Sequence, residues 1–190
     1  YEYPSSLPEP VKSRMRDSAR KVIGHLGIDD TPFNIEFFYD ADTDRIWLLE
    51  INARISKSHS PLFEKVDGVP HKEVMIDIAL GRRPEAPERQ GRFRYAAKYM
   101  PRLYGDHDDE VVHNVPDETR LQELHETYEG AQIQLHVDEG MRLADMPNRD
   151  PYSYELGAIF IGADSRDGLQ ETFDRLWSDI GLRFEKAKAA

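Results

Sequence analysis

Two stretches close together in the chain decide its fold: Phe33-Asn-Ile-Glu-Phe-Phe-Tyr-Asp40 and Arg45-Ile-Trp-Leu-Leu-Glu-Ile-Asn-Ala-Arg54. Each is a strand candidate, and the short link between them allows a β-hairpin that sets the strands side by side. Side chains alternate between the two faces of a strand, so Glu50, Asn52 and Arg54 are expected to share one face. The same alternation assigns Ile46 and Leu48 to that face, and to the opposite face Trp47, Leu49 and Ile51.

On the first strand the alternation groups Glu36 with Asn34 and Phe38, so Glu36 is expected near Glu50 and Asn52. Magnesium prefers hard oxygen ligands and usually takes one or two carboxylates together with substrate phosphates. The pattern is therefore compatible with a magnesium-phosphate site, to which a guanidinium would add a two-pronged contact for phosphate or carboxylate oxygens. It is equally compatible with the solvated face of a hairpin, and periodicity alone does not choose between them.

The hairpin motifs also support a resemblance to a known family. Glu36, the segment Leu49-Glu-Ile-Asn-Ala-Arg54, a loop containing serine, lysine and histidine, and Gly68-Val-Pro70 leading into a helix resemble the C-terminal half of an ATP-grasp domain. The resemblance is to the carbamoyl-phosphate synthase and biotin carboxylase branch and less to the other carboxylate-amine ligases. It implies ATP and Mg²⁺ as cofactors, with the nucleotide and metal held by Glu36, Glu50 and Asn52, and a phosphate contact from Arg54.

Two departures from the family pattern bear on the activity. Biotin carboxylases carry a Glu-His-Pro shortly after the arginine, whereas this chain has Ile55-Ser-Lys-Ser-His-Ser-Pro61, so that Ser58 stands in place of the acidic residue. A complete ATP-grasp enzyme also has an upstream part with a lid whose lysines grip the nucleotide. We therefore expect this chain to be a fragment of a longer enzyme, inactive alone, with the N-terminal ATP-grasp half of the same polypeptide as its partner.

Three loop residues are the candidates for catalysis. Arg54 would contact the γ-phosphate or an acyl phosphate, and Lys57 is the better candidate for a further phosphate contact. His59 could contact the second substrate or could be an ordinary surface residue. An acidic stretch near His107 is interpreted as a solvated loop rather than a metal site, because no glycine turn converges its carboxylates. The scattered histidines elsewhere lack metal-ligand spacing.

Composition narrows the class of protein. The chain has 190 residues, enough for one medium domain or two small ones, and carries a net charge of −11. That charge argues against binding to nucleic acid or an anionic membrane, since both attract basic patches. The chain has no cysteine, which excludes thiol catalysis and disulfides. Because no long apolar run or signal sequence is apparent, we expect a soluble, cytoplasmic protein, for which a homodimer is one conceivable assembly.

Periodicity predicts an α+β fold in two parts, residues 1–85 and residues 92–190. By the resemblance, residues 1–85 would be the C-terminal part of an ATP-grasp domain with an antiparallel sheet and packed helices, followed by a small β-rich α+β domain over residues 92–190. In the first part helices are expected over residues 11–26, 62–67 and 70–80, with Val74, Ile76, Ile78 and Ala79 partly buried. Residues 82–91, charged and rich in proline, are expected to form a linker or domain edge.

The second part is expected to mix short strands with two helices. Strands are predicted over residues 93–100, 110–115, 132–137, 141–144, 156–162 and 182–184, and a helix over residues 117–128. A further helix, capped by Asp164 or Ser165 and ended by Gly181, should bury one stripe made by Leu169, Phe173, Leu176, Trp177 and Ile180. This part resembles the small domain that follows the ATP-grasp core in such ligases.

Two classes of function remain open. The favoured one is an ATP- and Mg²⁺-dependent ligase that activates a small-molecule carboxylate as an acyl phosphate and joins it to an amine or another nucleophile. The alternatives are a non-catalytic ATP-grasp-derived module used for binding or oligomerisation, and a carboxylating enzyme of the carbamoyl-phosphate synthase or biotin carboxylase type, which Ser58 disfavours.

Overall fold

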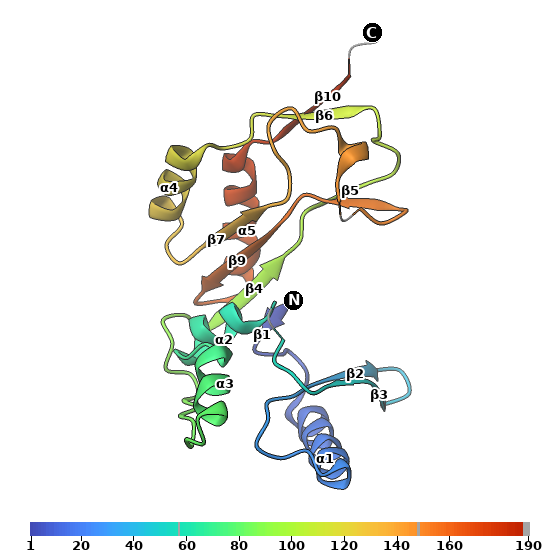
Figure 1. The fold of residues 1–190 in the computed structure, drawn as a ribbon, viewed down its shortest axis with the longest axis vertical. Coiled ribbons are helices and arrows are strands. Elements are labelled where there is room, and N and C mark those ends of the chain that lie inside the picture. The colour runs from blue at the N-terminus through green and yellow to red at the C-terminus, as the bar shows by residue number, and fades with distance from the viewer. Residues whose placement is uncertain (57, 148, 188–190) are drawn as a thin grey trace. The chain divides into compact units, whose positions relative to one another are not determined.

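The computed structural model describes residues 1–56, 58–147 and 149–187, and the chain separates into two compact units. The N-terminal unit is Pro4–Arg92, and the C-terminal unit combines Tyr1–Tyr3 with the described part of Phe93–Ala190 (Figure 1). Both units pack helices with antiparallel strands, so the predicted α+β class is confirmed.

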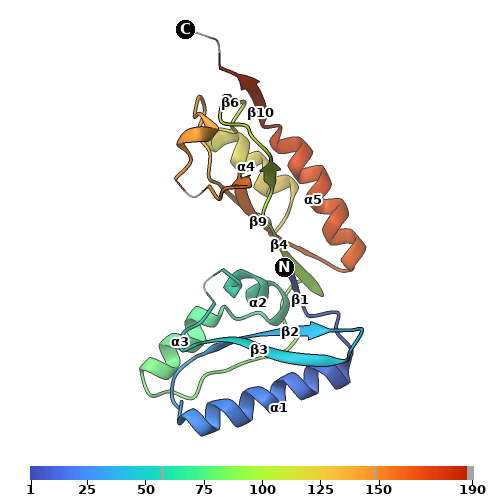
Figure 2. The same cartoon turned by 90° about the vertical axis from the view of Figure 1, so that its right-hand side faces the viewer.

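The N-terminal unit is built from a hairpin and three helices. Helix α1 (Glu9–Leu26) lies along one face of the hairpin formed by β2 (Asn34–Asp40) and β3 (Arg45–Asn52), as Figure 2 shows. Helices α2 (Ser60–Asp67) and α3 (His71–Ala79) follow. Helices α1 and α2 end where predicted because Gly27 and Gly68 adopt the left-handed conformation, with φ of 65° and 90°.

The hairpin turn is fixed by two aspartates. The carboxylate of Asp40 accepts hydrogen bonds from the Asp42 N–H (2.9 Å) and from the Thr43 hydroxyl (2.6 Å). The carboxylate of Asp44 accepts from the Tyr39 hydroxyl at 3.1 Å and pairs with the Arg14 guanidinium of α1. The hydrogen bond from Arg14 is the main reason why the pKa of Asp44 lies below its usual value. The turn is thereby attached to α1.

A β-bulge changes the predicted distribution of side chains on β3. Glu36 pairs with Glu50, but the next residue, Phe37, pairs with Leu48, so that Leu49 is the extra residue. The strict alternation predicted for β3 is therefore wrong on the turn side of the bulge. Ile46 and Leu48 share a face with Ile51, whereas Trp47 lies on the face of Glu50 and Asn52.

The N-terminal unit buries little apolar surface. Among its described residues the buried apolar side chains are Val11, Ile23, Leu62 and Val66. The prediction that Ile76 is partly buried is wrong, since this residue is 52% exposed, and Ala79 is exposed as well. Further large apolar side chains of the unit are exposed to solvent: Leu26, Phe33, Phe38, Trp47, Leu48, Leu49, Met75 and Leu80.

The end of the charged, proline-rich segment of residues 82–91 is attached to α2. The Arg89 N–H donates to the Asp67 carboxylate, and the Gly91 N–H donates to the Val66 carbonyl, both at 2.9 Å. A Cβ atom on Gly91 would lie 2.4 Å from the carbonyl oxygen of Lys65. Only glycine allows this close approach of two backbones.

The C-terminal unit contains a four-stranded antiparallel sheet in the order β1-β4-β9-β7, with helices α4 and α5 (Figure 1). Two further antiparallel pairs, β5 with β8 and β6 with β10, complete the unit. The bounds are β1 (Glu2–Tyr3), β4 (Tyr95–Tyr99), β5 (Arg102–Tyr104), β6 (Glu110–His113), α4 (Glu118–Thr127), β7 (Gln132–Leu135), β8 (Ser153–Glu155), β9 (Gly157–Ala163), α5 (Arg166–Ile180) and β10 (Arg183–Lys186).

The main core of this unit lies between the sheet and the two helices. Ile159 and Ile161 of β9 pack with the stripe predicted for α5, of which Leu169, Leu176 and Ile180 are buried. Ser165 caps α5 by accepting the Gly168 N–H at 3.0 Å, as one of the two predicted caps. The apolar periodicity therefore predicts this helix well.

The strand predicted over residues 141–144 is wrong. Leu143–Asp145 forms a short 3₁₀ helix, and Arg142 contributes an isolated bridge to Val111. Leu143 is completely buried in a second apolar cluster with Val112, Val137 and Leu156. The Leu143 side chain is therefore removed from solvent although the segment does not form a strand.

Among the described residues, no helix combines the length and the apolar character needed to cross a membrane.

We predict that Gly91→Ala destabilises the N-terminal unit, because the added methyl group would overlap the backbone of Lys65 and Val66. Gly24→Ala is the matched control, since nothing lies within 4 Å of its Cβ position, and it should be neutral or stabilising by up to about 1 kcal/mol. Urea unfolding followed by Trp47 fluorescence in a Trp177→Phe background reports on this unit alone. Equal midpoints for the two variants would contradict the prediction.

Candidate functional site

The carboxylates of Glu36 and Glu50 face each other across the hairpin. They occupy directly opposed positions in the register of β2 and β3, where the Cβ atoms of two residues lie about 5 Å apart. Asn52 lies two residues further along β3, on the same face, opposite Asn34. The structure thus brings together the two glutamates, and it places the predicted Asn52 amide beside them.

Neither glutamate side chain makes a hydrogen bond or an ion pair with the residues that the structure describes, and both side chains are exposed. Like charges that face each other across two strands repel. Two carboxylates with an adjacent amide carbonyl form a set of hard oxygen donors of the kind that Mg²⁺ accepts. The residues present therefore fit a divalent cation that also contacts phosphates.

An aromatic pair shares the face of the two glutamates. Phe38 and Trp47 oppose each other in the register, and their ring centroids are 5.8 Å apart at an interplanar angle of 40°. Strict alternation along the sequence predicts Phe38 on this face but Trp47 on the other, because it does not include the bulge at Leu49. An apolar run interrupted by a single extra residue carries no strong sequence signal for a bulge.

Arg54 lies just beyond the end of β3 and is exposed. Its guanidinium donates to the carbonyl oxygen of Ile55 at 3.2 Å, and most of its five donors have no acceptor among the residues that the structure describes. Lys57, predicted to contact phosphate, lies outside the described residues. The structure therefore places one cation of the predicted set next to the strand that carries Glu50 and Asn52.

His59 is half-buried at the start of α2, and it is engaged with its own loop. Its Nδ1 atom lies 2.8 Å from the Ser56 hydroxyl oxygen. The neighbouring Ser60 is 2% exposed, and its hydroxyl has no hydrogen-bond partner among the described residues. No sequence pattern pointed to this local network beyond the presence of the residues themselves.

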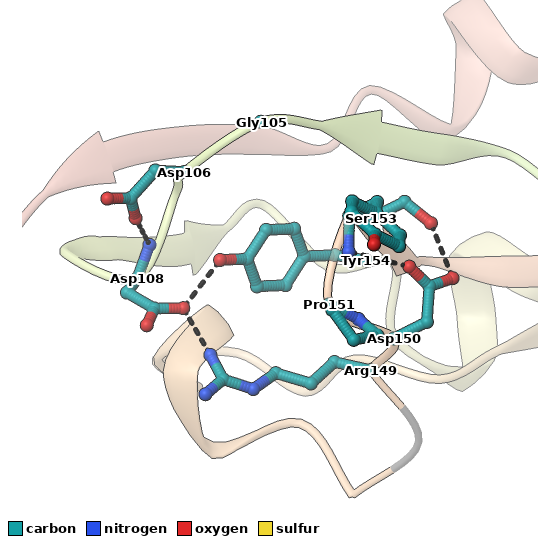
Figure 3. Close-up of a pocket in the computed structure, with 9 residues that line it drawn as sticks. Gly105, Asp106, Asp108, Arg149, Asp150, Pro151, Ser153 and Tyr154 are labelled. Carbon is teal, nitrogen blue, oxygen red and sulfur yellow. Dashed lines mark hydrogen bonds and ion pairs between the residues drawn. The ribbon is translucent and has the colours of Figure 1, made fainter.

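The acidic loop near His107 takes part in a separate pocket of the C-terminal unit. Figure 3 shows the Tyr154 hydroxyl and the Arg149 guanidinium both directed at the Asp108 carboxylate, with a distance of 2.5 Å for the tyrosine. Asp150 accepts from Arg102 and Ser153, each at 2.7 Å. These aspartates are neutralised by protein groups, and within the described ranges no group of three or more His, Asp or Glu residues is arranged to hold a metal ion.

Comparison with known proteins assigns the N-terminal unit. Residues 3–86 match the family model described as carbamoyl-phosphate synthase L chain, ATP binding domain. A carbamoyl phosphate synthase large chain from Thermotoga sp. (strain RQ2) is 43% identical over 76 residues, or 40% of this chain. One from Thermus thermophilus is 31% identical over 111 residues, or 58% of this chain. The chain spans only 7% and 10% of the lengths of these relatives.

Solved structures extend the likeness in fold over nearly the whole chain. A carboxyaminoimidazole ribonucleotide synthase from Aspergillus clavatus, complexed with ATP, aligns with a TM-score of 0.60 at 20% identity and covers 94% of this chain and 42% of its own. The Kluyveromyces lactis urea carboxylase aligns with a TM-score of 0.63 at 22% identity, covering 98% and 15%. At these identities the likeness concerns the fold alone.

The resemblance predicted from the hairpin motifs is therefore confirmed. Residues 3–86 match the ATP binding domain of the carbamoyl-phosphate synthase L chain in sequence, and the chain is similar in fold to the solved ATP-dependent synthase named above.

We predict that Glu50→Gln stabilises the metal-free chain slightly, because it removes the repulsion between opposed carboxylates on the hairpin. Glu85→Gln, an exposed glutamate without a described partner, is the control for the change in net charge. The measurement is the urea midpoint at low ionic strength, with Trp47 as the reporter. A lower midpoint for Glu50→Gln than for the control would show that Glu50 makes a stabilising contact instead.

Proposed function

We propose that the polypeptide carrying this chain is an ATP- and Mg²⁺-dependent ligase that activates a carboxylate as an acyl phosphate and joins it to an amine or another nucleophile. The observation that carries the proposal is the opposed pair Glu36 and Glu50, whose side chains have no partner in the described part of the chain, with Asn52 on the same face. The family match of residues 3–86, described as an ATP binding domain, supports the nucleotide.

The chemistry of the donor set supports Mg²⁺ as the cation. Glu36, Glu50 and Asn52 would hold Mg²⁺, with phosphate oxygens of ATP completing its shell. A bound Mg²⁺ supplies charge neutralisation on the phosphates. The hairpin contributes a fixed register, so that the two carboxylates are already opposed before the cation arrives.

Arg54 and Lys57 are the proposed contacts to the transferring group. In the first step a carboxylate oxygen of the acid attacks the γ-phosphorus of ATP, and ADP leaves. In the second step the amine attacks the acyl carbon, inorganic phosphate leaves, and the nitrogen loses a proton. A guanidinium at the phosphoryl group would stabilise the negative charge that develops on its oxygens.

The partner of the N-terminal unit is proposed to be the preceding part of the same ATP-grasp domain. Support comes from the small buried core of this unit and from the exposed apolar side chains of the hairpin, of which Phe38 is 55% and Leu49 is 62% exposed. Apolar patches of this kind usually mark an interaction surface. The matched relatives are also much longer polypeptides.

A second candidate acid is bicarbonate. The relatives matched by sequence are carbamoyl phosphate synthase large chains, and a structural neighbour with a TM-score of 0.61 is a biotin carboxylase domain bound to bicarbonate. Against it stands Ser58, where biotin carboxylases carry an acidic residue. The two candidates use the same Glu36, Glu50 and Asn52 site and differ in the acid that is phosphorylated.

We predict that Glu50→Gln in the intact polypeptide lowers ATP turnover by about 100-fold or more, because the proposed Mg²⁺ site would lose one of its two carboxylates and with it the charge neutralisation of the phosphates. Release of ADP is measured with panels of carboxylic acids and with bicarbonate, and hydroxylamine is added to trap an acyl phosphate as a hydroxamate. Hydroxamate formed from a carboxylic acid supports the ligase, whereas turnover that depends on bicarbonate alone supports the carboxylating alternative.

Glu85→Gln is the control for that experiment and should turn over ATP like the wild type. Near-normal turnover by Glu50→Gln would contradict the assigned cation site. Nucleotide binding without turnover by the wild-type polypeptide, with any acid, would favour a non-catalytic module.

We also predict that Trp47 is shielded in the intact polypeptide. In this chain Trp47 is 41% exposed, so iodide should quench its fluorescence readily in a Trp177→Phe background. Burial under the preceding ATP-grasp segment would lower the quenching constant. Equal quenching in the intact polypeptide and in this chain would show that this face of the hairpin is not the covered one.

A further inference from the structure

The loop between β3 and α2, of which the structure describes residues 53–56 and 58–59, connects the strand of the proposed cation site to a well-packed helix. Arg54 lies near the beginning of this loop and His59 at its end. A loop of this length, exposed near Arg54, needs contacts of its own to hold one conformation, since ordering a backbone residue costs about 1–2 kcal/mol.

Ser56 and His59 supply those contacts. The Ser56 carbonyl accepts the N–H groups of His59 at 3.1 Å and of Ser60 at 3.2 Å. Alongside these backbone bonds, the Ser56 hydroxyl oxygen lies 2.8 Å from Nδ1 of His59. The His59 carbonyl in turn accepts the Leu62 N–H at 2.9 Å, which places His59 at the entry of α2.

Helix α2 is held in place by buried side chains. Leu62 and Val66 on this helix are 3% and 0% exposed, in a unit that buries little else. The helix is also bonded through Asp67 and Val66 to the segment that ends at Gly91. Because His59 directly precedes this buried helix, its contact with Ser56 fixes the end of the loop relative to α2.

We propose that His59 is a positioning residue, which holds the loop bearing Arg54 to the start of α2 through its Nδ1 contact with Ser56. The proposal rests on the proposed function and refines it, because it assigns His59 to the placement of Arg54 and not to contact with a substrate. One ring nitrogen is already engaged within the loop, and the ring is half-buried.

The test compares four variants of the intact polypeptide and one double variant. His59→Asn keeps an amide near the place of Nδ1, whereas His59→Gln moves the amide toward the place of Nε2. His59→Ala and Ser56→Ala each remove the side-chain contact, and the double variant removes both partners. His125→Ala, an exposed histidine of α4 without a described partner, is the control.

We expect His59→Ala and Ser56→Ala to lower kcat for ATP turnover by about 10- to 100-fold, the scale on which small misplacement of a contacting group acts. The double variant should be no worse than the more impaired single variant, because both changes remove the same contact. His59→Asn should restore most of the activity with an unchanged pH profile, and His59→Gln should not.

Two outcomes overturn the proposal. Loss of activity in His59→Asn equal to that in His59→Ala, together with loss of one limb of the pH profile, would show that the imidazole itself transfers a proton. Activity unchanged in His59→Ala would show that the contact positions nothing.

Amide hydrogen exchange separates this proposal from the proposed function. If the wild-type polypeptide has no ATP turnover, the proposed function fails. The variants are then compared by the rate of amide hydrogen exchange over residues 54–62. Faster exchange in His59→Ala and Ser56→Ala, restored in His59→Asn, would support the positioning of the loop. Exchange equal to that of the wild type would overturn it.

Discussion

Two like charges held opposite each other on neighbouring strands are the constraint on which this site depends. The hairpin could relieve the repulsion between Glu36 and Glu50 by shifting its register, but the turn prevents this. Asp40 closes the turn through its hydrogen bonds, and Asp44 attaches the turn to α1 through Arg14. The carboxylates stay opposed because the turn fixes the register, so the proposed cation site would be preformed.

The N-terminal unit exposes apolar side chains that its own described residues do not cover. Its described residues bury four apolar side chains, whereas the hairpin presents Phe38, Trp47 and Leu49 to solvent. A two-stranded hairpin is at best marginally stable alone, so such a surface is consistent with a unit that folds as part of a larger domain. The face that carries the proposed cation ligands also carries the aromatic pair, so its covering segment would close over the site.

Sequence patterns predicted the elements better than their details. The pairing of Glu36 with Glu50 follows from two strands and a short turn, and the helices of both units follow from apolar periodicity and glycine ends. The face of Trp47 was missed because one extra residue, Leu49, reverses the alternation without any change in composition. The strand predicted over residues 141–144 is wrong because burial of Leu143 in a tertiary cluster outweighs local strand propensity. The roles of Arg54, Lys57 and His59 remain predictions.

Neither β3 nor α2 alone determines the conformation of the loop between them. Strand β3 ends at Asn52, and among the described residues no strand pairs with Arg54. Helix α2 begins at Ser60 and is held by its buried Leu62 and Val66. The side-chain contact between Ser56 and His59 adds to the two backbone bonds that span this gap, and a bond inside a short turn costs little additional chain entropy. The conformation of the loop thus depends on the packing of α2. The packing of α2 depends in turn on residues far from the carboxylates in sequence, including Gly91, whose backbone lies close to that of Lys65 and Val66.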